Sequence, residues 1–171
     1  PPPKSGAHAA AEPAPAPADV DALLAAYTAA EEGNARQAAE ARLVAAGRPV
    51  LDRLIAWLAD DEHASDAEEL IPKFGAAAVA PLVAALDAHE RRTRQRVVGV
   101  LSNLASEWAW SDQGPSVCRA LLAQIDVFDF ADLVEGVNVG AAACAALARS
   151  GPAGRSIAKE LGERWLRSVR P

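Results

Sequence analysis

A short template repeats four times along this chain, and it constrains the fold more than any other feature. Each copy starts at a Gly and places apolar residues 3, 4, 7, 8 and 11 positions later, which is the spacing of one face of a helix. The fourth copy is weaker, because Gly162 stands at its fourth apolar position. A glycine followed by a one-sided helix, recurring, predicts stacked helical units that bury a core against their neighbours. The copies begin at Gly47, Gly75, Gly114 and Gly154.

A second template precedes each Gly and predicts another helix there. In its clearest copy, Thr93-Arg94 is followed by Val97 and Leu101, and similar copies occur upstream of Gly47 and Gly75. Each Gly then suits the left-handed position that ends one helix before the next begins. The last unit carries a slip of three residues, since its upstream template points to Gly151 and its downstream template to Gly154.

This two-helix pattern resembles the HEAT repeats of bacterial proteins over about residues 34 to 169. The resemblance implies an all-α fold, an α-α superhelix of about four HEAT-like helix pairs, whose usual work is to hold other molecules. The Gly-to-Gly spacings are 28, 39 and 40, against a usual period of about 40, so the second unit departs from the family pattern through a shortened first helix. The chain also inserts residues 106–113 between the helices of the third unit, and Gly140 stands where the fourth unit should have its Arg.

The chain divides by composition into two parts. Residues 1–17 form a Pro/Ala-rich tail or linker, and residues 18–171 are expected to form the helical-repeat domain. The tail does not begin with Met, so we expect a processed product or a piece of a longer one; a cytoplasmic and an exported location both remain open. The sequence contains no run of roughly 18 apolar residues, so it predicts no membrane span. The expected helices lie near 19–31, 34–46, 49–59, 64–73, 76–89, 91–106, 115–125, 131–149 and 155–168.

Charge and motifs narrow the function. The net charge of −6 disfavours nucleic acid as a partner, because phosphate binding needs clustered cations. His63 lies among carboxylates that lack the ligand spacing of a calcium loop, and no paired histidines suggest zinc. We therefore expect no metal, no cofactor and no catalytic residue. Cys118 and Cys144 fall on expected inward faces, either as two buried thiols or, in an oxidising compartment, as a disulfide.

The inserted segment holds the most unusual local sequence, with Trp108, Trp110 and Asp112 close together. Two interpretations stay open: the rings fill a gap left by the irregular unit, or they form an exposed anchor for a partner. Phe128 and Phe130 are expected along the same edge of the stack.

A basic cluster, Arg91 to Arg96, also has two interpretations. Arg94 occupies the position where HEAT repeats carry an Arg that bonds within the stack. Arg91, Arg92 and Arg96 then either pair with the nearby Asp87 and Glu90 or form a patch for an acidic partner.

Together these features predict a non-catalytic scaffold or adaptor that binds another protein, alone or as a subunit of a larger assembly. The alternative is an enzyme on damaged DNA, because some HEAT-like folds are DNA glycosylases that use Trp and Asp side chains around a lesion. The Trp, Asp and Arg residues here have that composition, but none can be matched to a catalytic position.

Overall fold

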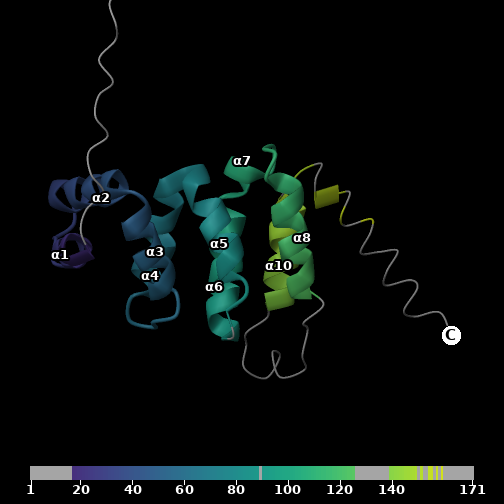
Figure 1. Ribbon diagram of the computed structural model, residues 1–171, viewed down its shortest axis with the longest axis horizontal. Coiled ribbons are helices and arrows are strands. Elements are labelled where there is room, and N and C mark those ends of the chain that lie inside the picture. The colour runs from purple at the N-terminus through teal and green to yellow at the C-terminus, as the bar shows by residue number, and fades with distance from the viewer. Residues whose placement is uncertain are drawn as a thin grey trace, which may run out of the picture. The chain divides into compact units, whose positions relative to one another are not determined.

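The structure is a computed structural model, and it describes residues 17–88, 90–125 and 139–149 together with positions 151, 154, 155, 157 and 159. Within these residues every regular element is a helix, which confirms the all-α class (Figure 1). The chain forms two compact units, Pro1–Val50 and Leu51–Pro171, so the boundary falls inside α3. The two units are described separately.

The first unit contains two helices that pack together, α1 (Pro17–Thr28) and α2 (Asn34–Ala46). Tyr27 at the end of α1 is completely buried. The guanidinium of Arg36 lies over the Tyr27 ring, 4.4 Å from its centroid, and Nη2 donates to the phenol oxygen at 2.5 Å. This contact joins the two helices through stacking and a hydrogen bond at once.

The second unit contains the remaining elements, with α3 reaching into it from the boundary. The helix α10 packs against both α6 and α8 (Figure 1). The 3₁₀ helix η1 contacts α4, α5, α6 and α7. The bounds are α3 (Arg48–Trp57), α4 (Ala64–Leu70), η1 (Ile71–Ala78), α5 (Val79–Ala85), α6 (Arg91–Asn103), α7 (Ala105–Trp108), α8 (Gly114–Ile125) and α10 (Val139–Arg149).

The template predicts the buried face of the helices correctly. Positions 3, 4 and 7 of the first three copies are all buried, whereas position 8 is only half-buried in two of them, at Ile55 and Val83. Position 8 lies at the edge of the apolar stripe, because a helix turns by about 100° per residue. The buried residues of these copies are Val50, Leu51, Leu54, Leu58, Ala78, Val79, Leu82, Leu86, Val117, Cys118, Leu121 and Leu122.

The backbone conformation differs among the glycines that the template contains. Gly47, Gly75 and Gly151 have φ of 70°, 56° and 58°, a region that L side chains rarely adopt. The left-handed conformation thus occurs at Gly151, and its expectation at Gly154 was wrong. It was also wrong for Gly114, which opens α8 without positive φ. Gly114 is needed for packing instead, because an added Cβ would lie 3.0 Å from the Trp108 carbonyl oxygen.

Candidate functional site

The two tryptophans of the insertion have opposite environments. Trp108 ends the short helix α7 and is completely buried. Its indole Nε1 donates to the Leu101 carbonyl at 2.8 Å. Leu101 lies in the last turn of α6, where carbonyl groups lack partners within the helix, so the indole supplies a missing donor. Trp108 therefore fills the core, which agrees with the first of the two interpretations that the sequence left open.

Trp110, two residues after Trp108, is exposed to solvent. Its side chain is 77% exposed, and it is the one large hydrophobic residue so exposed in the part of the chain that the structure describes. The turn that carries it is held by Ser111, whose Oγ donates to the Trp108 carbonyl at 2.9 Å and accepts from the Gln113 amide at 3.2 Å. The indole rests against Gly151, where an added Cβ would lie 3.2 Å from Cζ2 of the ring.

Carboxylates flank this exposed ring in the sequence. Glu107 and Asp112 are both exposed, and no described cation forms an ion pair with either. Glu107 lies with a carboxylate oxygen 3.7 Å from the position of a Cβ built on Gly75, and the indole of Trp110 lies against Gly151.

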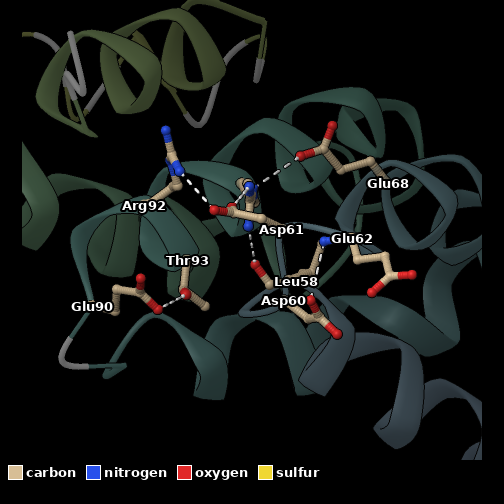
Figure 2. Close-up of polar contacts among 9 residues, drawn as sticks. Leu58, Asp60, Asp61, Glu62, Glu68, Glu90, Arg92 and Thr93 are labelled. Atoms are coloured by element: carbon tan, nitrogen blue, oxygen red, sulfur yellow. Dashed lines mark hydrogen bonds and ion pairs between the residues drawn. The ribbon is translucent and has the colours of Figure 1, made fainter. Parts of the chain in front are cut away.

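The basic cluster is held mainly by contacts inside the molecule. Arg96 is mostly buried, and its guanidinium donates from Nη1 to the Leu58 carbonyl at 2.8 Å and from Nη2 to Asp61 (Figure 2). Its Nε lies 3.9 Å from a carboxylate oxygen of Glu68. Arg92 donates from Nη1 to the other oxygen of Asp61 at 2.9 Å. The expected pairing of these arginines with Asp87 and Glu90 is therefore not what the structure shows.

The rest of the cluster lies at the start of α6. Arg94 donates to the Ala88 carbonyl at 2.7 Å, and Arg91 is half-buried with contacts of its own. Glu90 accepts a hydrogen bond from Thr93 Oγ1 at 2.9 Å instead of pairing with an arginine (Figure 2).

Asp61 is the centre of this network. The hydrogen bond from Arg96 and the charge of Arg92 hold the pKa of its carboxyl below the ordinary value. Asp61 lies in the turn between α3 and α4, and both arginines project from α6. The network therefore fastens that turn to a helix about thirty residues further along the chain.

An open cleft of about 410 Å³ lies beside this network, between α4 and α6. Its walls combine charged and neutral polar side chains with one glycine and one apolar residue. The lining residues are Glu68, Arg92, Gln95, Arg96, Gly99, Val100 and Asn103.

The other expectations are answered only in part. His63 lies with Nδ1 3.1 Å from an Asp60 oxygen and its ring 4.5 Å from that of Trp57. Among the described residues, no group of three or more His, Cys, Asp or Glu is placed to hold a metal ion, and no helix could cross a membrane. Phe128 and Phe130 lie outside the described residues, as does the side chain of Cys144, while Cys118 is buried.

Comparisons with protein-family models, curated proteins and solved structures find no match. The candidate site therefore depends on geometry alone. Sequence reasoning did not find Asp61 or the cleft. A signal for the cleft was present, however, because Arg92, Gln95, Gly99 and Asn103 recur every three or four residues and so share one helix face.

Proposed function

We propose that this chain is a non-catalytic scaffold of HEAT-like helix pairs that binds another protein, with Trp110 as its anchor. The observation that carries the proposal is the 77% exposure of an indole held on an ordered turn. Tryptophan is enriched among the few interface residues that dominate binding energy.

The energy available from this one ring is substantial. A tryptophan side chain buries roughly 200 Å² when fully covered, and about three quarters of that area is open at Trp110. At about 25 cal/mol per Å², covering the exposed part would contribute about 4 kcal/mol before the costs of association. The ring is already positioned by the Ser111 turn and by Gly151, so little freedom is lost on binding.

The partner chemistry follows from the surroundings of the ring. The exposed Asp112 follows the ring by two residues, so the partner we propose presents an apolar pocket to the indole and a basic group to this carboxylate. The arginines at positions 92 and 96 contribute less to such an interface than the sequence suggested, because both bind Asp61.

The glycosylase alternative gains no support from this arrangement. Its Trp, Asp and Arg residues do not converge on one surface, since Trp108 is buried and Arg96 is held by internal acceptors.

A photo-crosslinking experiment tests the proposal. A benzophenone amino acid is placed at position 110 and, as a matched control, at the exposed Ala84 of α5. We expect one protein from the native host to crosslink at 110 and not at 84. With that protein purified, Trp110→Ala should weaken binding by at least about thirtyfold, which corresponds to about 2 kcal/mol, while far-UV circular dichroism stays unchanged. Equal affinity of wild type and Trp110→Ala would exclude the anchor.

A further inference from the structure

Gly99 is a residue that the fold itself does not explain. It lies inside α6, where glycine is about 1 kcal/mol less favourable than alanine. Its φ is not positive, so no turn requires it. A Cβ added there would meet no atom within 4 Å, so internal packing does not require it either. Gly99 is exposed, and the missing side chain leaves room for the main chain of a ligand to approach the helix closely.

Gly99 lies in the cleft between two unused carboxamides. Gln95 and Asn103 are one helical turn away on either side, and both line the cleft. Neither side chain makes a hydrogen bond to the described residues. Each carboxamide offers both donors and an acceptor, the same groups that a peptide unit carries.

The charged groups of the cleft are balanced but incompletely used. Arg92 binds Asp61 through Nη1, and the other nitrogens of its guanidinium have no partner among the described residues. Arg92 and Arg96 line the cleft together with Glu68, and Asp61 beside the cleft binds both arginines, so the charges of these four groups sum to zero. A balanced, polar cleft suits a ligand with dipoles and one acidic group better than it suits a polyanion.

We propose that this cleft binds an extended peptide segment of the partner protein, whose main chain crosses Gly99. Gln95 and Asn103 hydrogen-bond to peptide groups of the segment, and an acidic side chain of the segment binds the open edge of Arg92. The inference rests on the proposed protein-binding function and names a second contact for it.

The spacing along α6 fits such a segment. Gln95 and Asn103 are eight residues apart, which is about 12 Å along a helix and about four residues of extended chain. Arg92 precedes Gly99 by seven residues, or about 10 Å, so the acidic residue should lie about three positions from the residue over Gly99.

The test uses the full chain and a phage-displayed library of random heptapeptides. We expect selected sequences to share one Asp or Glu at a fixed position. Gly99→Gln fills the cleft with a good helix former, and Ala123→Gln adds the same side chain to the exposed surface of α8 as a control. In fluorescence anisotropy with a selected peptide, Gly99→Gln should weaken binding at least about tenfold and Ala123→Gln should leave it unchanged.

Further variants separate the outcomes. Gly99→Ala keeps the helix and should still weaken binding of the selected peptide. Gln95→Ala and Asn103→Ala should each lower the affinity for this peptide several-fold. Trp110→Ala should not affect the isolated peptide. The proposal is overturned if no peptide is enriched or if the selected peptide binds Gly99→Gln as tightly as wild type. If Trp110→Ala abolishes binding of the crosslinked partner and Gly99→Gln leaves that binding unchanged, the scaffold function stands and the cleft proposal is overturned.

Discussion

The buried indole of Trp108 makes a large and specific contribution to stability, which a matched pair of substitutions can measure. Trp108→Ala removes a fully buried ring of roughly 200 Å², worth about 5 kcal/mol at 25 cal/mol per Å². Trp110→Ala removes a ring of the same size, but only about a quarter of it is covered, so the loss should be about 1 kcal/mol. The same substitution at two positions two residues apart should therefore lower the free energy of unfolding by amounts that differ about fivefold.

A third variant separates the hydrogen bond from the packing. Trp108→Phe keeps most of the apolar contact but leaves the Leu101 carbonyl without its donor at 2.8 Å, which should cost about 1–3 kcal/mol. Urea unfolding followed by far-UV circular dichroism should rank the losses as Trp108→Ala, then Trp108→Phe, then Trp110→Ala. Equal midpoints for the two alanine variants would refute the assignment of Trp108 to the core and of Trp110 to the surface.

Since two guanidinium groups lower the folded-state pKa of Asp61, its stabilising contribution is present above the unfolded pKa and is lost as pH falls through the lower folded value. Asp61→Asn should therefore reduce stability at neutral pH and flatten the acid side of a plot of urea midpoint against pH. Gly151→Ala should cost about 1–2 kcal/mol in urea unfolding because of its positive φ, and should change acrylamide quenching of Trp110 by displacing the ring. Gly114→Ala should lower the thermal midpoint, because its Cβ would lie 3.0 Å from a backbone oxygen, whereas Gly99→Ala should raise it.

The helical class and the buried faces could be predicted because they depend on local periodicity. An apolar residue three, four or seven positions after a glycine lies on one side of a helix in any context, and the structure buries those positions. Helix ends were less predictable. The expected helix over 64–73 ends at Leu70, and a 3₁₀ helix continues through the kink at Gly75. A 3₁₀ helix repeats every three residues, and the kink at Gly75 leaves too few turns on either side for that period to be read from the sequence.

The candidate site could be predicted only in part, because its decisive contacts are distant in sequence. Trp108 and Trp110 look equivalent in an insertion without a template, and the end of α6 decides which of them is buried. Arg92 and Arg96 were matched with the nearest acids, yet they bind Asp61, which lies 31 and 35 residues away. Local charge pairing is a weak guide when a turn from another helix pair can supply a better-placed carboxylate.

The glycines allow the requirements of folding to be distinguished from those of the proposed binding. Gly75 and Gly151 are required by positive φ, and Gly114 by the backbone that a Cβ would strike. Gly99 meets neither requirement, so folding alone would favour alanine there by about 1 kcal/mol. A residue that lowers stability without a structural reason is expected where binding needs the space. The opposite responses expected of Gly99→Ala, greater stability and weaker peptide binding, would thus mark Gly99 as a binding residue, whereas a gain in stability with unchanged binding would show that the cleft carries no such constraint.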